Sequence, residues 1–475
     1  MEIPLTIEET QKKLLERKFS TLELLEAYLE RIKKHDKDLN SFITISEEKA
    51  REEARCIDES IHRYKTLEEV RHDKPLFGVV VAYKDIFLTK RIRTTAASKV
   101  LENYIPVYSA TVVERLETAG AIMIGKTNCD AWAHGSSGEN SDFGPTKNPW
   151  NKDFVPGGSS SGSGAAVAAN LTTVATATDT CGSTRLPANY CGVVGLKPTY
   201  GAVSRYGIVA MASSLDSPGA ITRSVEDSKT VFEVIKGEDG KDSAVKSEIS
   251  KQKSVNSKLR IGIPKEFFSE GVDQEVASKI YEAINILKKD GVEFKEISLP
   301  HTKYGISTYY IIQPAEVSSN LARYDGIRYG KNRTVFSDEA KRRIMLGTYV
   351  LSSGYYDAFY LKAMKVRGLI IKEIEKVFDS SADGVDALIA PVSPTPPFKL
   401  GEKVHDPLKM YLTDIFAATA NLAGIPSLAL PFGKSAAGLP LGFQLMGPRL
   451  SENTLFELGK RFERLTDYTP KVAID

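Results

Sequence analysis

A run of glycine and serine at residues 155–167 most constrains what this chain can fold into. The segment reads Val-Pro-Gly-Gly-Ser-Ser-Ser-Gly-Ser-Gly-Ala-Ala-Val, and neither a helix nor a strand favours so much Gly and Ser. Gly lets the backbone take positive φ and approach a ligand closely, so such a loop can present hydroxyl and N–H groups. The alanine-rich run 165–169 predicts the start of a buried helix, whose free N–H groups and positive dipole end would face the loop.

Three chemistries compete for this loop. A phosphate-binding P-loop requires a Lys after its last Gly, and no Lys follows here; the dinucleotide-binding pattern also fails at its last Gly. Gly158–Gly162 matches the Gly-x-Ser-x-Gly of a nucleophile elbow, but that fold needs a later acid followed by a His, and only His301 and His405 remain downstream. The third chemistry is a serine amidase that activates its hydroxyl with a lysine.

Lys84 meets the requirement of the third chemistry. Residues 77–83 form an apolar run, interrupted only by Gly78, that predicts a fully buried strand ending at Lys84 and Asp85. Burying a Lys is costly unless its pKa falls or its amine is hydrogen-bonded, and a neutral Lys is a competent base. Taken alone, Lys84 is explained more simply as a strand-end residue whose amine extends to water.

Lys84, the loop 157–162 and the segment Asp179-Thr-Cys-Gly-Ser-Thr-Arg185 together resemble the amidase signature family. That family uses a Ser–cisSer–Lys triad, in which a cis peptide bond precedes the bridging serine. The resemblance implies that Ser183 is the nucleophile, Ser159 the bridging serine and Lys84 the base. Neutral Lys84 would take the proton of Ser159, which in turn takes that of Ser183 as its oxygen attacks an amide carbon.

The same resemblance places an oxyanion hole at the backbone N–H groups of Thr180, Cys181 and Gly182, together with that of Ser183. Cys181 departs from the family pattern, because relatives usually carry Gly or a small apolar residue there; this puts the geometry of the hole in question. Ile86 also replaces the Asn that often follows Lys-Asp. Neither departure removes a member of the triad.

Segments 308–330 and 341–357 resemble the tRNA-dependent amidotransferase branch of this family, whose substrate is glutamine. Free glutamine carries an α-carboxylate and an α-ammonium group, so its site needs a cation and an anion. The resemblance assigns these roles to Arg343 and Asp414, with Tyr309 nearby, and a guanidinium suits a carboxylate because it can bind two oxygens. Read alone, Arg343 has a second explanation as part of a surface ion pair, whereas Asp414 precedes an apolar run and is harder to explain as a solvated charge.

The resemblance implies a glutaminase subunit that releases ammonia from glutamine. A partner B subunit would use ATP and Mg to activate misacylated Glu-tRNA(Gln) or Asp-tRNA(Asn), and a small C subunit would complete the assembly. No phosphate-binding motif is visible in this chain, in agreement with ATP chemistry on the partner. Two alternatives stay open: a stand-alone amidase that shares the triad but lacks the clamp for a zwitterion, and a catalytically silent scaffold subunit.

Composition narrows the class of protein. The chain has 475 residues, 42% of them hydrophobic, and a net charge of +2, so it can build a large core but has no global basic field for binding nucleic acid. Its four Cys lack Cys-x-x-Cys spacing and its six His are scattered, which favours a reducing compartment and no metal site. Neither a signal peptide nor an apolar run of transmembrane length is visible, so we expect a cytoplasmic protein without membrane contact.

Alternating strand and helix patterns predict an α/β fold with helices on both faces of a sheet, and the resemblance implies that this sheet is mixed and twisted. Two capping-box motifs, Thr6–Glu9 and Ser20–Glu23, predict helix starts, and a third, charged helix is expected over 47–67. We expect one domain over residues 1–475. Its expected parts are a helical portion (1–70), a catalytic core (71–236), a polar connection (237–258) and a C-terminal part with the substrate-binding residues (259–475).

Overall fold

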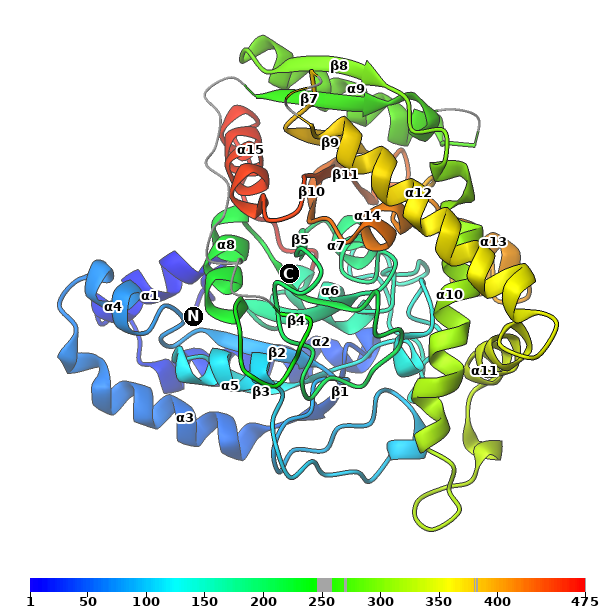
Figure 1. Ribbon diagram of the computed structural model, residues 1–475. Coiled ribbons are helices and arrows are strands. Elements are labelled where there is room, and N and C mark those ends of the chain that lie inside the picture. Colours follow the sequence, from blue (N-terminus) through cyan, green and yellow to red (C-terminus); the bar gives the residue numbers. More distant parts are fainter. Residues whose placement is uncertain (246–258, 269–270, 380, 382, 475) are drawn as a thin grey trace.

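A mixed sheet of 11 strands runs through the whole molecule (Figure 1). The computed structural model describes residues 1–245, 259–268, 271–379, 381 and 383–474, so most of the predicted polar connection 237–258 lies outside the described residues. The strands are β1 (Phe42–Ile45), β2 (Val80–Lys84), β3 (Ile122–Thr127), β4 (Val174–Asp179), β5 (Val194–Lys197), β6 (Ser217–Thr222), β7 (Arg260–Pro264), β8 (Glu293–Ile297), β9 (Ala387–Ala390), β10 (Ser427–Lys434) and β11 (Pro440–Met446).

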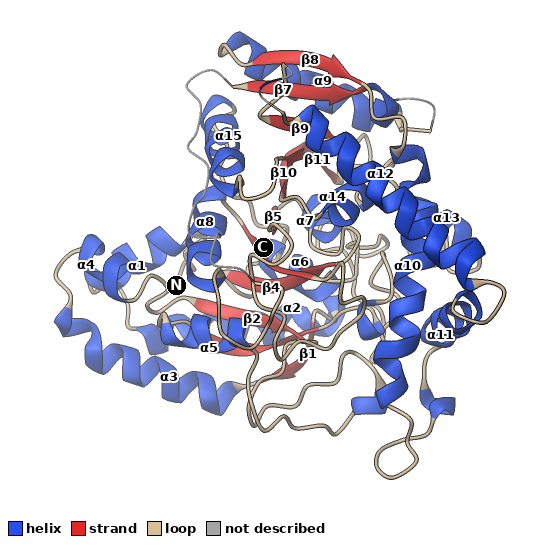
Figure 2. Ribbon diagram, in the orientation of Figure 1, coloured by secondary structure: helices blue, strands red, loops and turns tan. Residues whose placement is uncertain are grey.

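The strand order is β1-β3-β2-β4-β6-β5-β10-β11-β9-β7-β8. β2 pairs in parallel with β3 and β4, and β7 with β8 and β9, whereas the remaining neighbours are antiparallel. Helices cover both faces (Figure 2), which confirms the predicted α/β fold with a mixed sheet.

Helices accompany the sheet along its whole length (Figure 1). The first five surround the end that contains β1 to β4, and α9 accompanies β7 and β8 at the opposite end. The helices are α1 (Ile7–Leu15), α2 (Thr21–Leu39), α3 (Glu47–Ser60), α4 (Leu67–Asp73), α5 (Thr111–Thr118), α6 (Ser161–Ala168), α7 (Arg185–Cys191), α8 (Val225–Ile235), α9 (Gln274–Lys289), α10 (Gly305–Asn320), α11 (Asp338–Val350), α12 (Lys362–Val377), α13 (Pro407–Leu412), α14 (Ala418–Ala423) and α15 (Glu452–Leu465).

The four residues of β2 that precede Lys84 are apolar because both faces of this strand are buried. Successive side chains of a strand point to opposite faces of the sheet. Val81 and Tyr83 enter the hydrophobic cluster on one face, and Val80 and Ala82 enter the cluster on the other. All four side chains are fully buried, so both faces of β2 need apolar residues. The predicted buried strand that leads to Lys84 is therefore confirmed, although its regular part begins at Val80.

The two predicted capping boxes differ in the structure. At the start of α2, Ser20 Oγ accepts the N–H of Glu23, and the Glu23 carboxylate accepts the N–H of Ser20, as predicted. At α1, Thr6 Oγ1 accepts the N–H of Glu9, but the Glu9 carboxylate accepts the N–H of Leu5. Only half of the predicted reciprocal pair is therefore present at Thr6.

The prediction of a single helix over 47–67 is wrong, because the helix that begins at Glu47 ends earlier than expected. Helix α3 ends at Ser60, a short 3-10 turn follows, and α4 begins at Leu67. The physical reason is a further capping box, in which Thr66 and Glu69 exchange side-chain-to-backbone hydrogen bonds. A capping Thr takes an extended backbone conformation, so it starts a new helix and cannot continue the preceding one.

Helices α10 and α11, which carry two of the predicted substrate-binding residues, pack in close contact. At Gly347 of α11 a Cβ atom would lie 1.8 Å from the carbonyl oxygen of Pro314 in α10, so only Gly fits this crossing. The close packing of α11 on α10 therefore depends on the absence of a side chain at position 347.

We expect Gly347→Ala to destabilise the protein by about 1–3 kcal/mol, because the added methyl group must push the two helices apart. Gly368→Ala in α12 is the matched control, since nothing lies within 4 Å of the new Cβ there. Replacing an unhindered helical Gly by Ala should stabilise by about 0.5–1 kcal/mol. Chemical denaturation measures both; effects of the same sign would contradict the proposed helix contact.

Candidate active site

The amine of Lys84 lies at the buried end of β2. Lys84 is 0% exposed, and its Nζ donates hydrogen bonds to Ser159 Oγ at 2.8 Å and to Thr178 Oγ1 at 2.9 Å. Burial lowers the pKa of this amine to about 8, although neighbouring acidic groups oppose the shift. Lys84 can therefore lose its proton within the ordinary pH range while remaining bound to a serine hydroxyl.

The Gly/Ser loop lies between Lys84 and the predicted nucleophile. The peptide bond between Gly158 and Ser159 is cis, as the family resemblance implies. The N–H of Ser160 donates to the carbonyl of Ser183 at 3.1 Å, which holds the two loops side by side. Lys84 and Ser159 are 0% exposed but Ser183 is 6% exposed, so of the three predicted triad residues only Ser183 retains access from outside.

Strand β4 contacts both the predicted base and the turn of the predicted nucleophile because its side chains alternate between the two faces of the sheet. Thr176 Oγ1 accepts a hydrogen bond from the backbone N–H of Lys84 at 2.9 Å, and Thr178 Oγ1 accepts one from the side-chain Nζ of Lys84. Asp179 follows Thr178, so it points to the other face of the sheet. There its carboxylate meets the turn that carries Ser183. The Val-Ala-Thr-Ala-Thr-Asp sequence of β4 thus supports the predicted base on one face and the turn of the predicted nucleophile on the other.

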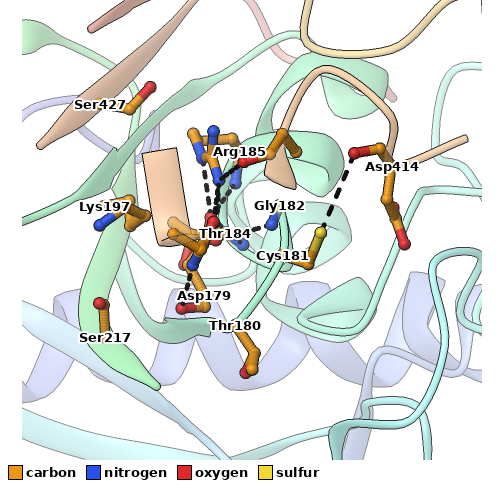
Figure 3. Close-up of polar contacts among 12 residues, drawn as sticks. Asp179, Thr180, Cys181, Gly182, Thr184, Arg185, Lys197, Ser217, Asp414 and Ser427 are labelled. Carbon is orange, nitrogen blue, oxygen red and sulfur yellow. Dashed lines mark hydrogen bonds and ion pairs between the residues drawn. The ribbon is translucent and has the colours of Figure 1, made fainter. Parts of the chain in front are cut away.

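A buried ion pair between Asp179 and Arg185 fixes the turn that carries Ser183, and Figure 3 shows this pair beside Gly182 and Thr184. Asp179 accepts the N–H of Gly182 at 2.7 Å and that of Thr184 at 3.2 Å, and its two oxygens accept Arg185 Nη2 and Nε, each at 3.0 Å. Both ionic side chains are 0% exposed. Burial alone would raise the pKa of Asp179, but the Arg185 guanidinium holds it below its usual range.

This ion pair changes the predicted oxyanion hole. The N–H of Gly182 is bound to Asp179, so in this structure it is not available to an oxyanion. Among the described residues, none accepts a hydrogen bond from the N–H groups of Thr180, Cys181 and Ser183. Three of the four predicted donors therefore have no acceptor within the described chain and lie in the turn of the predicted nucleophile.

The predicted glutamine-binding residues meet at a tyrosine that the sequence analysis did not identify. Arg343 lies over the ring of Tyr310, with its Cζ 5.4 Å from the ring centroid, and the Tyr310 hydroxyl donates to Asp414 at 3.3 Å. The predicted cation and anion thus contact the same side chain. Tyr309 is also buried, and its ring packs edge-to-face on Tyr310 with the centroids 4.9 Å apart. The sequence places Tyr309 and Tyr310 side by side, and only the helix orientation distinguishes them.

Two further contacts complete this part of the site. Arg343 Nε donates a hydrogen bond at 2.7 Å to Oε1 of Glu339, which lies one helical turn earlier on α11. Ser136 Oγ donates to Asp414 at 2.5 Å, although the two residues are 278 positions apart. Burial raises the pKa of Asp414 to about 7, opposed by Ser136 and then by Arg343. No local signal identifies Ser136 beyond its place in a long polar loop.

A cavity of about 450 Å³ opens beside these residues. Ser136, Glu339 and Arg343 contribute to its wall together with Tyr411, whose ring stacks on Tyr310 at 3.8 Å. This volume falls in the range of small-molecule sites, about 300–1,000 Å³. The cavity therefore has room for an amino acid and presents a guanidinium to it.

The described parts of the chain contain neither a metal site nor a membrane span. No three His, Cys, Asp or Glu side chains there lie close enough together to hold a metal ion. No described helix is both long and apolar enough to cross a bilayer. All four cysteines are free.

The sequence model of the Amidase family matches residues 23–456, and the chain belongs to that family. This confirms the resemblance from which the triad was predicted. The chain is similar to the A subunit of glutamyl-tRNA(Gln) amidotransferase from Geobacter metallireducens, with 48% identity over 491 residues that cover 99% of each chain. It is 49% identical to the corresponding protein of Geotalea daltonii over 489 residues, again 99% of each. The crystal structure of the Thermotoga maritima counterpart superposes with a TM-score of 0.80 at 39% identity, covering 99% of this chain and 100% of that one.

Proposed function

We propose that this protein is the glutaminase subunit of a tRNA-dependent amidotransferase. The observation that carries the proposal is the pair Arg343 and Asp414, which meet on Tyr310. A clamp for both charges of an amino acid distinguishes a glutaminase from an amidase of simple amides. The names of the similar proteins from Geobacter metallireducens and Geotalea daltonii support the same function.

In the proposed reaction, glutamine becomes glutamate and ammonia. Neutral Lys84 takes the proton of Ser159, Ser159 takes that of Ser183, and Ser183 Oγ forms a bond to the carboxamide carbon. The negative oxygen that results is stabilised by the free N–H groups of Thr180, Cys181 and Ser183. The relay then returns the proton to the leaving nitrogen as the C–N bond breaks. Water hydrolyses the acyl-enzyme by the same relay.

The substrate is oriented by charge. Arg343 would bind the α-carboxylate, and Asp414 would bind the α-ammonium group, with Tyr309 and Tyr310 closing the apolar side. Because burial raises the pKa of Asp414, its ionised form gains most when a cation is bound beside it. Cation binding and ionisation of Asp414 would therefore reinforce each other.

The partners follow from the same function. A B subunit would bind ATP and Mg and use the ammonia to amidate misacylated Glu-tRNA(Gln) or Asp-tRNA(Asn), with a small C subunit in the assembly. The net charge of +2 favours tRNA binding mainly by the partner. We place the assembly in the cytoplasm, with the other components of translation.

The first test is glutaminase activity of the co-purified assembly, with and without misacylated tRNA. Ser183→Ala should lower kcat by about 10⁴-fold or more, because the nucleophile is lost. Ser160→Ala is the matched control, since Ser160 is a buried neighbour of Ser159 that has no part in the relay. It should still form the acyl-enzyme. Full activity of Ser183→Ala would instead identify a scaffold subunit.

The second test concerns substrate selectivity. Arg343→Ala should raise the KM for glutamine about 10- to 100-fold, the worth of a charge-assisted hydrogen bond, and leave hydrolysis of amides without an α-carboxylate unchanged. Steady-state kinetics with both substrates measures the ratio. An unchanged preference for glutamine would favour a stand-alone amidase.

The third test is the pH dependence of kcat/KM. Only the neutral amine of Lys84 accepts a proton, and its pKa is lowered to about 8. Activity should therefore fall about tenfold per unit as the pH decreases below 8 and reach a plateau above it. A profile that stays level from pH 6 to 9 would exclude Lys84 as the base.

A further inference from the structure

We propose that Asp216 is a positioning residue for this reaction, because it anchors the oxyanion-binding turn through Thr180 and places an unpaired negative charge near Lys84. The inference rests on the proposed glutaminase function and assigns a role to a residue outside the triad and the glutamine clamp.

Asp216 binds the turn directly. Thr180 Oγ1 donates to Asp216 Oδ1 at 2.7 Å. The other carboxylate oxygen accepts the N–H of Met211 at 3.0 Å and of Ala212 at 3.1 Å. Every group bound to Asp216 is a donor, which is the environment of an ionised carboxylate. Asp216 is buried, so these bonds have little competition from water.

The sheet register brings the two residues together. β4 and β6 are antiparallel, with Asp179 opposite Ser217 at the end of the ladder. Thr180 follows Asp179 and Asp216 precedes Ser217, so both leave the same end of the sheet. Their contact is therefore set by strand pairing and does not depend on a mobile loop.

Two carboxylates thus hold different parts of the turn. Asp179 binds its later part through the N–H groups of Gly182 and Thr184, and Asp216 binds its first residue through the Thr180 hydroxyl. The N–H groups of Thr180 and Cys181, for which the described part of the chain offers no acceptor, belong to this doubly anchored turn. An oxyanion hole requires donors that are fixed before charge develops, and this arrangement supplies that rigidity.

The charge of Asp216 has a second effect. Within the described residues no Lys or Arg forms an ion pair with Asp216, whereas Asp179 is paired with Arg185. Burial raises the pKa of Asp216 to about 6, so its carboxylate is ionised at the pH above about 8 where Lys84 is neutral. Asp216 lines one cavity together with Thr178, whose hydroxyl accepts a hydrogen bond from Lys84 Nζ at 2.9 Å. The charge of Asp216 raises the pKa of Lys84 against the larger effect of burial. The other groups whose charges raise the pKa of Lys84 are Cys129, Asp130 and Asp179. The ionisable groups that interact electrostatically with Asp216 itself include Glu316, Arg205, Tyr200 and Tyr309.

The first experiment removes the hydroxyl and keeps the shape. Thr180→Val in the full assembly should lower kcat about 10²-fold, because the donors move, and leave the KM for glutamine nearly unchanged. The affinity for glutamate γ-semialdehyde, which forms a tetrahedral adduct with Ser183, should fall by a similar factor. Thr180→Ser keeps the hydroxyl and should retain most of the activity.

Three outcomes would overturn the anchoring role: an unchanged kcat in Thr180→Val, a change confined to KM, or equal loss in Thr180→Ser. These results are distinct from failure of the proposed function, which is shown by glutaminase activity that survives Ser183→Ala.

The second experiment removes the charge. Asp216→Asn keeps the size of the side chain, and the loss of a negative charge lowers the pKa of Lys84, so the acid limb of kcat/KM should move to lower pH. Asp227→Asn is the matched control, because Asp227 is also buried and accepts a backbone N–H, that of Ile7 at 3.1 Å, on α8. The limb should stay in place in this variant. An unmoved limb in Asp216→Asn, or an equal shift in Asp227→Asn, would overturn the electrostatic role.

Discussion

The buried ion pair between Asp179 and Arg185 is the interaction on which the rest of the site depends. Arg185 donates to Gln444 on β11 and to Asn421 on α14, each at 2.6 Å, so one guanidinium joins the turn after β4 to segments more than 230 positions further along the chain. Removing either ion would leave a buried, uncompensated charge at a cost of about 3–5 kcal/mol. The pair therefore couples the nucleophile turn to the complete formation of the C-terminal half.

Three buried carboxylates have two different roles in this site because their surroundings differ. Asp179 is paired with a guanidinium and its pKa lies below its usual range. Asp216 and Asp414 lie where burial dominates, which raises their pKa to about 6 and about 7. The first is a permanent structural anion, whereas the other two respond to neighbouring charge. Lys84 lies among them and can lose its proton, because within the described residues no carboxylate forms an ion pair with its amine.

Sequence reasoning reached those parts of the molecule that short-range patterns encode. The apolar run before Lys84, the capping box at Ser20 and the α/β alternation each depend on neighbouring residues, and the structure agrees with them. The family motifs also led to Lys84 and Ser159, whose side chains are 2.8 Å apart. The split of the helix expected over 47–67 was missed although Thr66 supplied a local signal.

The residues that sequence reasoning missed are joined by long-range contacts. Ser136 acquires its place only by binding Asp414, and Tyr310 only because α10 presents its ring to Arg343. The capture of the Gly182 N–H by Asp179 also depends on the path of the turn. A motif identifies which residues belong to such a turn, but which donors remain free is a property of the folded backbone.

Cys181 shows how the turn tolerates a departure from the family pattern. An oxyanion hole uses backbone N–H groups, so the side chain at 181 matters only through the space that it fills. The thiol is buried and lies 3.9 Å from the carbonyl oxygen of Asp414 (Figure 3). At Gly182, by contrast, φ is +94° and a Cβ would lie 2.8 Å from that of Ala417. The turn therefore requires Gly at 182 and accepts Cys at 181, where the sulfur packs this turn against the segment that carries Asp414, the proposed substrate-binding anion.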